Sequence, residues 1–427
     1  MIFDINVGIM EVATLEMTDY RPVLNAYKNG VVPSFIPENL CVGRDAETSE
    51  FKRCFTDTAS GTSCIKWIIG EYGAGKSFML NHLKSQALTG EFVVSHIQID
   101  KTFRFNNLEQ MYYQIMHNLF VKNVSGRKCS FDDLFDIWIE NLQNTPNRSQ
   151  SAEEINKVIE TLSRFNNAFA RSFLTYIRAR IQKNHTVSDA VAAWITGEKN
   201  IPVNLKKQFG IVGSIDKFNM MDFMKAFTHL ITLLGYKGFV VLVDELDLIV
   251  DERSDIRMTA YANLRQLIDL TSASELKNTF FILSATPRLI NDENKGVATY
   301  GALSQRMGHA IDPMRRNMGD LRQPVVWLKP LTHHDFSAFT DAFYALYATE
   351  YDIELKISKE SLKNWVLLSY HKEGLNVHEL TFRDFSTKLL EILDIIQQNP
   401  KNNVFRSELH AVEKNGQIVF KSRSISG

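Results

Sequence analysis

Hydrophobic residues follow two different periods along this chain, and the two alternate over most of its length. Short apolar runs rich in β-branched residues, typical of buried parallel strands, lie at residues 65–69, 92–100, 238–249, 278–287 and 324–331. Between such runs, apolar positions recur with the helical period, as at Tyr261, Leu264, Leu267 and Ile268. Strands that alternate with helices predict an α/β fold with a parallel sheet flanked by helices.

Residues 107 to about 235 interrupt this alternation, because they carry almost no strand signal. The segment predicts helices separated by polar loops at "QNTPNRSQS" and "TGEKNIPVN". Its last helix is expected to end at Gly235 and has one apolar face, formed by Phe223, Phe227, Leu230 and Leu234. We therefore expect a long helical insertion, at about residues 107–217, within the α/β region.

The stretch "WIIGEYGAGKSFML", from Trp67 to Leu80, carries the most specific motif in the chain. It matches G-x-x-x-x-G-K-[ST] and lies between a predicted strand and a predicted helix. Glycines let successive backbone N–H groups curl around a phosphate, and the helix N-terminus adds positive potential. We expect ATP or GTP to bind the loop residues Gly70, Gly73, Ala74, Gly75, Lys76, Ser77 and Phe78.

Two side chains of this loop have separate chemical roles. Lys76 supplies a mobile positive charge for the β- and γ-phosphates, and the Ser77 hydroxyl is a ligand for Mg²⁺. The alternative is a glycine-rich turn that matches the motif by accident. The preceding strand and the following helix argue against that alternative.

Two acidic residues, Asp244 and Glu245, end the apolar run at residues 239–243. Because ligands gather at the carboxyl ends of parallel strands, we expect Asp244 to hold Mg²⁺ through water and Glu245 to polarise the attacking water. The alternative is that both acids only cap the next helix. Asp247 is interpreted as a solvated or capping residue. Since the chain has no N-K-x-D motif of small GTPases, the Asp-Glu pair favours ATP hydrolysis in the additional-strand class that includes AAA+ proteins.

The composition limits the classes of partner. The 48 Lys and Arg residues nearly balance 49 Asp and Glu residues, so any contact with DNA requires a local basic patch. The cysteines lack zinc-site spacing and predict free thiols in a reducing compartment; they are Cys41, Cys54, Cys64 and Cys129. The N-terminus lacks a signal-peptide pattern, and the apolar runs are too short for a membrane span. We expect a cytoplasmic protein with no membrane partner.

Further motifs resemble those of origin-recognition-like AAA+ ATPases. "CVGRDAE" is similar to their G-R-x-x-E sequence, in which residues near the arginine, here Arg44, help to seat adenine. "FILSATP", "ALSQRM", "WLKPLTHHDF" and "ELTFRDFSTKLLEIL" occupy the places of the sensor-1 strand, the arginine-finger helix, the strand leading into the lid and the sensor-2 helix.

A narrower resemblance covers residues 25 to about 395. In order, "KNGVVPSFIPENLCVGRD", "GEYGAGKSF", "GYKGFVVLVDELD" and "LSATPRLI" look like the ATP-binding proteins of BREX phage-defence systems, the BrxC/BrxD-type family. The length suits the shorter, BrxD-like members. The resemblance implies an AAA+ core at residues 41–330, with the insertion inside it, and a helical lid at 331–400. These follow an N-terminal extension at 1–40 and precede a tail at 401–427, in which Asn415-Gly416 predicts the turn of a β-hairpin.

The resemblance also implies roles for the two sensors, with departures from the usual pattern. AAA+ proteins often place Asn at sensor 1, whereas the candidates here are Ser284 and Thr286, of which Thr286 is taken as catalytic. Arg383 takes the sensor-2 position and is expected to contact the nucleotide, although Phe382 precedes it where Pro is usual.

The arginine finger is assigned to Arg306, because it lies on the segment that follows the sensor-1 strand. Arg315 and Arg316 are close enough in the sequence to compete for this role. The alternative for each arginine is a surface salt bridge of small energetic consequence.

The function implied is an Mg²⁺-dependent ATPase of an antiviral complex. We expect a homo-oligomer that shares its ATP site between subunits, works with partner proteins of the defence system and acts on or with DNA. Two alternatives stay open: a slow ATP-dependent switch that controls a partner enzyme, and a loader ATPase of the origin-recognition or transposition type. The basic clusters "RARIQK", "NLKKQ" and "MRRN" are either phosphate contacts or solvated helix faces.

Overall fold

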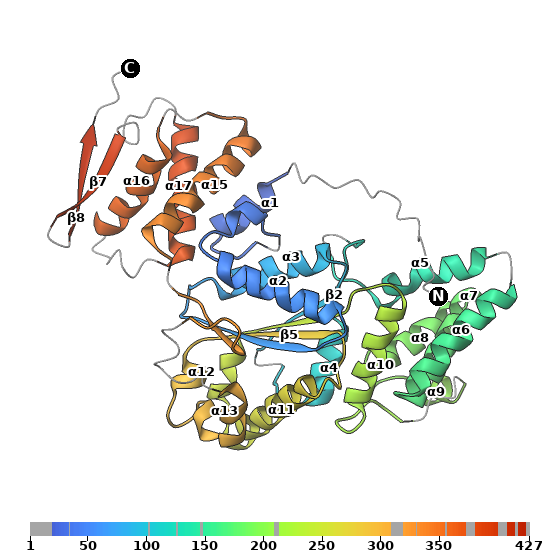
Figure 1. Cartoon of the computed structure of the whole chain (residues 1–427). Helices are drawn as coiled ribbons and strands as arrows, with labels where there is room; N and C mark the ends of the chain where they lie inside the picture. Colours follow the sequence, from blue (N-terminus) through green and yellow to red (C-terminus); the bar gives the residue numbers. More distant parts are fainter. Residues whose placement is uncertain are drawn as a thin grey trace. The chain divides into compact units, whose positions relative to one another are not determined.

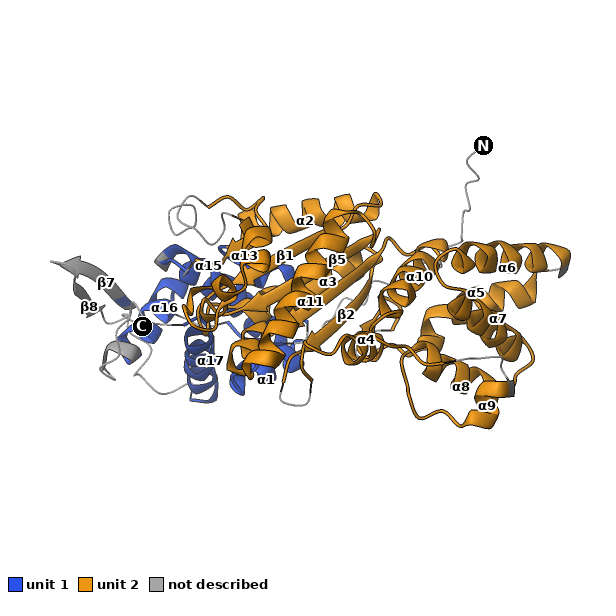
Figure 2. Ribbon diagram, turned by 90° about the horizontal axis from the view of Figure 1, so that it is seen from below, with its two compact units in different colours: residues 1–43, 330–427 blue, residues 44–329 orange. Residues whose placement is uncertain are grey.

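The computed structural model describes residues 19–33, 35–100, 103–124, 127–145, 148–208, 213–308, 319–329, 331–354, 357–372, 381–399, 408–414 and 417–423. The chain divides into two compact units, which Figure 2 shows in different colours. Unit 2 is continuous, residues 44–329, whereas unit 1 combines residues 1–43 with residues 330–427. Each unit is described by itself below.

Unit 2 is built on a six-stranded sheet with the order β3-β2-β4-β5-β1-β6. The strands are β1 (Cys64–Ile69), β2 (Val93–Gln98), β3 (Leu119–Phe120), β4 (Phe239–Asp244), β5 (Thr279–Ala285) and β6 (Val325–Trp327). All neighbouring pairs are parallel except β2 with β3. The predicted parallel sheet is therefore confirmed, and β5 lies between β1 and β4 although it follows both in the sequence.

The two faces of the sheet are covered by different helices. α2 (Asp45–Ala59) and α3 (Lys76–Thr89) lie on one face, and α4 (Leu108–Met116) and α11 (Ser254–Ser272) lie on the other (Figure 1). Since successive strand residues point to opposite faces, Phe280 packs against the rings of Phe51 and Phe55 in α2, whereas Phe281 joins the core on the α11 side. Both faces are thus buried, as expected for a parallel sheet.

The segment between β2 and β4 is mostly helical, as its sequence pattern predicts. Besides α4 it contains α5 (Phe131–Asn144), α6 (Arg148–Ser163), α7 (Asn167–Ile181), α8 (His185–Ile195), α9 (Val203–Gln208) and α10 (Met220–Leu233). The exception is β3, whose two residues extend the sheet at one edge. The large aromatic residues of this segment, including Phe135, Phe173 and Trp194, belong to the same buried cluster as Val241 of β4. The insertion therefore shares its hydrophobic core with the sheet.

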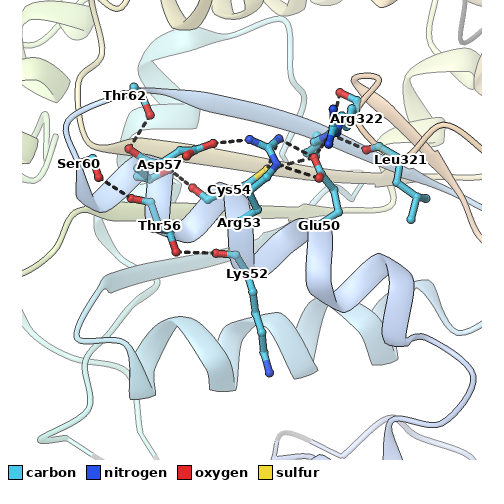
Figure 3. A network of polar contacts seen from close by, with 12 residues as sticks. Glu50, Lys52, Arg53, Cys54, Thr56, Asp57, Ser60, Thr62, Leu321 and Arg322 are labelled. Carbon is cyan, nitrogen blue, oxygen red and sulfur yellow. Dashed lines mark hydrogen bonds and ion pairs between the residues drawn. The ribbon is translucent and has the colours of Figure 1, made fainter.

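A buried polar network supports the beginning of β1. The Lys66 ammonium group donates to the main-chain carbonyls of Leu321, Arg322 and Gln323 at 2.7, 3.1 and 2.9 Å. It also pairs with the carboxylate of Glu50 at 2.8 Å, and Glu50 accepts from Arg53 at 2.7 Å on the same helix (Figure 3). The network fixes the segment that leads into β6.

The apolar run at residues 238–249 forms a shorter strand than its sequence predicts. β4 ends at Asp244, and a 3-10 helix η2 (Leu246–Asp251) follows. The change occurs at Glu245, whose backbone is left-handed, with φ 59° and ψ 37°. A residue in that conformation cannot continue a strand, so the apolar residues after it turn back into the core. α12 (Arg288–Asn291), η3 (Val297–Thr299) and α13 (Gly301–Met307) complete unit 2 after β5.

Unit 1 is a helical body with a terminal hairpin. It contains α1 (Arg21–Lys28), η1 (Glu38–Leu40), α15 (His333–Tyr351), α16 (Lys359–Lys372), α17 (Phe382–Gln398), β7 (Glu408–Lys414) and β8 (Gln417–Arg423). α1 packs within this unit: the Tyr27 ring contacts Phe339 and Phe343, and Lys28 pairs with Asp394 at 2.9 Å. β7 and β8 are antiparallel, which confirms the hairpin, while its predicted turn at residues 415–416 lies outside the described residues.

Candidate functional site

The glycine-rich loop at residues 70–77 connects β1 to α3, as predicted. Gly73 and Gly75 have φ values of 78° and 90°, which glycine adopts without a steric penalty. A Cβ atom on Gly70 would lie 3.2 Å from the Cβ of Ala74 and 3.3 Å from that of Leu328. The loop is therefore compact, and it leads into the N-terminus of a 14-residue helix, whose free N–H groups favour an anion.

Lys76 begins α3 and is held over the loop by hydrogen bonds to the loop itself. Its ammonium group donates to the carbonyls of Gly70 at 2.9 Å and Glu71 at 3.0 Å. Burial lowers the pKa of Lys76, while the negative charges of Asp247, then Asp244, act in the opposite direction. Within the described residues it makes no ion pair with a carboxylate. Its charge is thus available to an incoming anion.

Ser77 and Phe78, the other predicted loop residues, occupy the first turn of α3. Ser77 is half-buried, and Phe78 is buried. Because the Phe78 ring is buried, a contact with a nucleotide would use the Phe78 backbone rather than its side chain.

Arg44, which the resemblance places near adenine, forms a hydrogen bond with the glycine-rich loop. The guanidinium donates to the carbonyl of Ala74 at 3.3 Å and to that of Lys329 at 2.9 Å, and it lies 3.5 Å from Glu47. The residue is 7% exposed. Its side chain ties the glycine-rich loop to the end of unit 2, and a direct contact with a nucleotide stays a prediction.

The tips of β1, β4 and β5 meet beside this loop. Gly70 donates its N–H to the carbonyl of Ala285, the last residue of β5, at 3.2 Å. Ser284 donates its hydroxyl to Asp244, the last residue of β4, and the same carboxylate accepts from the N–H of Glu245 at 2.9 Å. Sequence-distant polar residues therefore converge at the carboxyl ends of three parallel strands, where ligands of open α/β sheets bind.

Asp244 and Glu245 differ in their surroundings. Asp244 is 7% exposed and is oriented by two hydrogen bonds, whereas the Glu245 side chain is exposed. The left-handed backbone of Glu245 costs roughly 1–3 kcal/mol for a residue with a Cβ. A strained backbone that turns a carboxylate out of the sheet is typical of functional sites.

The interpretation of Asp247 as a solvated or capping residue is wrong. Its carboxylate accepts two hydrogen bonds from one residue: the N–H of Thr286 at 3.1 Å and the hydroxyl of Thr286 at 3.0 Å. Asp247 is also first among the carboxylates whose charge opposes the lowered pKa of Lys76. The spacing D-E-x-D is the sequence signal that could have indicated this role, because one further turn brings Asp247 back beside the strand tips.

The predicted arginines lie in three different settings. Arg306, on α13, forms an ion pair with Asp269 of α11 and donates to the Ala302 carbonyl at 2.9 Å; its side chain is 33% exposed. Arg383 lies in the first turn of α17, in unit 1. Arg315 and Arg316 lie outside the described residues.

The basic clusters are only partly free of internal partners. In "RARIQK" the side chains of Arg178 and Lys183 are exposed, but Arg180 pairs with Asp132 and Asp136. Lys206 and Lys207 of the second cluster lie on the six-residue helix α9. The third cluster, residues 314–317, lies outside the described residues.

These residues fit a polyphosphate with a hydrated cation. The free N–H groups at the helix N-terminus and Lys76 supply positive charge, whereas Asp244, Glu245 and Asp247 supply acceptors a short way along the same sheet edge. The described residues contain no cluster of three or more His, Cys, Asp and Glu side chains able to hold a metal directly. A Mg²⁺ ion suits such a site, because it keeps several waters and is bound with substrate phosphates.

Comparison with known families agrees with this geometry. A family model described as "BREX system ATP-binding protein BrxC/D" matches residues 16–411. The chain belongs to the BrxC/D family. No curated protein matches it. ATP is therefore the nucleotide that the family implies, in agreement with the sequence-based expectation. Nowhere in the described residues is a helix both long and apolar enough to cross a membrane.

Proposed function

We propose that this BrxC/D protein hydrolyses ATP with Mg²⁺ at the loop formed by residues 70–77. The observation that carries the proposal is the convergence of three strand tips, through the Gly70–Ala285 and Ser284–Asp244 hydrogen bonds, beside Lys76. A positive loop next to an acidic sheet edge supports the proposal, because phosphoryl transfer to water uses both kinds of group.

Each residue has a distinct role in this proposal. Lys76 binds the β- and γ-phosphates, and Ser77 and Asp244 hold Mg²⁺, which neutralises charge on the phosphates when bound. Glu245 accepts a proton from the attacking water, since its exposed carboxylate follows the last residue of β4 directly. Arg44 keeps the loop in its binding conformation through the Ala74 carbonyl.

Glu245→Gln and Lys76→Ala test this assignment together. Glu245→Gln should retain Mg²⁺-dependent ATP binding and slow hydrolysis at least about a hundredfold, because it removes the base and keeps the shape. Lys76→Ala should remove ATP binding itself. Calorimetry with ATP and a phosphate-release assay separate the two. Unchanged hydrolysis in both variants would show that the loop is structural.

The proposal extends to an assembly that shares its ATP site and acts on or with DNA in antiviral defence. Arg306 would reach the γ-phosphate of a neighbouring subunit, as arginine fingers supplied in trans do. Its ion pair with Asp269 must break for that contact. During nucleotide-driven assembly the Arg306 guanidinium therefore has to exchange its carboxylate partner for a phosphate. DNA enters the proposal through the resemblance to origin-recognition-like ATPases and the exposed Arg178 and Lys183.

The same ion pair supports a second candidate, a slow ATP-dependent switch that controls a partner. A finger held by Asp269 gives a subunit that binds ATP but turns it over slowly. Mixing Arg306→Ala with Lys76→Ala subunits distinguishes the two candidates. Partial recovery of ATPase activity supports the shared site. A protein that stays monomeric with ATP and shows no recovery supports the switch.

A further inference from the structure

Thr286 gives both of its hydrogen-bonding protons to one carboxylate. Its N–H donates to Oδ1 of Asp247 at 3.1 Å, and its hydroxyl donates to Oδ2 at 3.0 Å. A hydroxyl has one proton and two lone pairs, whereas a carboxylate oxygen only accepts. The proton between the two side chains therefore belongs to Thr286, and the free positions on its oxygen are lone pairs.

Thr286 also lies close to the glycine-rich loop, where it matters whether its hydroxyl donates or accepts a hydrogen bond. It follows Ala285, whose carbonyl accepts from Gly70 at the start of the glycine-rich loop. Ser284, two residues earlier, gives its own hydroxyl proton to Asp244. Both hydroxyls at the tip of β5 are thus donors. Ser284 donates to Asp244, which ends β4, and Thr286 donates to Asp247, which follows β4. Neither has a proton left for a phosphate oxygen.

We propose that Asp247 is a positioning residue of the ATP site. By accepting the hydrogen bond of the Thr286 hydroxyl, it leaves only lone pairs on that oxygen, so that Thr286 acts as a hydrogen-bond acceptor in the site. An accepting oxygen is repelled by a phosphate oxygen, but it can align a water molecule by accepting one of its protons. Thr286 would then orient the attacking water for Glu245 rather than bind the γ-phosphate. The inference rests on the proposed location of the ATP site.

Asp247→Asn reverses the polarity of this contact. The Thr286 N–H can only donate, so it selects the amide oxygen of Asn; the amide nitrogen must then face the Thr286 hydroxyl and donate to it. The hydroxyl proton is released toward the nucleotide. The substitution also removes a negative charge. Measuring the effect of Thr286→Val with and without Asp247→Asn separates the loss of charge from the change in the hydrogen-bonding role of Thr286.

The test measures ATP and ADP affinity by calorimetry with Mg²⁺, in proteins that also carry Glu245→Gln to prevent turnover. Thr286→Val alone should change the affinity for ATP less than about twofold, because its proton is not on the phosphate. In the Asp247→Asn background the same substitution should weaken ATP binding about tenfold and leave ADP unchanged, the scale of one hydrogen bond to a charged group. With Glu245 present, Asp247→Asn should lower kcat and also lower KM.

Asp251→Asn is the matched control. Asp251 and Arg288 form an exposed ion pair between η2, which also contains Asp247, and α12, which begins two residues after Thr286, so its loss reports the structural effect of removing a neighbouring contact. It should leave affinity, kcat and KM unchanged. Thermal unfolding of every variant shows whether the fold is retained.

The inference is overturned if Thr286→Val weakens ATP binding equally with and without Asp247→Asn. If Asp247→Asn fails to fold, a tenfold loss of ATP affinity from Thr286→Val alone overturns it. A parent protein that binds no ATP overturns the location of the site and the inference with it. A protein that binds ATP but does not hydrolyse it contradicts only the proposed ATPase activity, since the affinity cycle does not depend on turnover.

Discussion

Two lysines of the same strand–loop–helix unit show how differently this molecule uses a buried positive charge. Lys66, in β1, has a carboxylate and three main-chain carbonyls as partners and is 2% exposed. Lys76, ten residues later, is half-buried, and within the part of the chain that the structure describes it donates to the carbonyls of Gly70 and Glu71. Lys66 is saturated and structural, whereas Lys76 is partly desolvated and has no carboxylate partner among the described residues.

The difference explains which charge can bind a ligand. A buried ammonium group whose donors are all used has nothing to offer a phosphate. An ammonium group that is desolvated and unpaired gains strongly from an anion, because the cost of its burial has already been met by the fold. The following changes test this contrast, from the largest expected effect on the free energy of unfolding to the smallest.

Lys66→Met should destabilise the protein by roughly 3–5 kcal/mol, because it removes one of the two cations that pair with the buried Glu50 and also the donor that three main-chain carbonyls share. Urea unfolding followed by circular dichroism measures the loss. Lys52→Met, at an exposed position of α2, is the control and should stay within about 0.5 kcal/mol. A loss below about 1 kcal/mol for Lys66→Met would mean that water replaces the ammonium group.

The loss of unfolding free energy at acidic pH should depend on Glu50. Burial alone would raise the pKa of Glu50, but hydrogen bonds from Arg53 and Lys66 outweigh it and lower the pKa to about 2. Because the folded pKa lies below the ordinary value of 4.5, the stabilisation is complete above pH 4.5 and is lost as the pH falls toward 2. The stabilisation is on the order of 3 kcal/mol, since each pKa unit corresponds to about 1.4 kcal/mol.

Comparison with Glu50→Gln isolates this contribution from those of other carboxylates. Unfolding free energies measured between pH 2.5 and 6 should fall more steeply in the parent protein than in Glu50→Gln. Parallel curves for the two proteins would contradict the assignment of the low pKa to this carboxylate.

Lys76→Met should leave the free energy of unfolding at pH 7 within about 0.5 kcal/mol of the parent, or slightly higher. Burial lowers the pKa of Lys76, so the folded state disfavours its charged form, and that cost is relieved as the pH rises toward 10.5. Excess Mg²⁺–ATP should stabilise the parent by about 2.7 kcal/mol at a hundred times Kd, and the variant not at all. A large loss of stability would place Lys76 with Lys66 as a structural residue.

The sequence by itself determined the parts that depend on local pattern. The glycine-rich loop, the helix after it and the apolar strands are each specified within about twenty residues, by backbone requirements and by hydrophobic period. The same is true of the helical insertion and of the hairpin formed by β7 and β8. Family membership followed from the order of these motifs along the chain.

Only the tertiary structure decided how the polar residues pair. Asp247 meets Thr286, Lys66 meets residues 321–323, and Arg306 meets Asp269, across separations of 39, 255 to 257, and 37 residues. The Asp247 contact arises because β5 is inserted between β1 and β4, and because the left-handed Glu245 turns the chain at the tip of β4. A hydrogen bond has no period in the sequence; its partners are set by strand order and by burial, which makes an unpaired polar group costly.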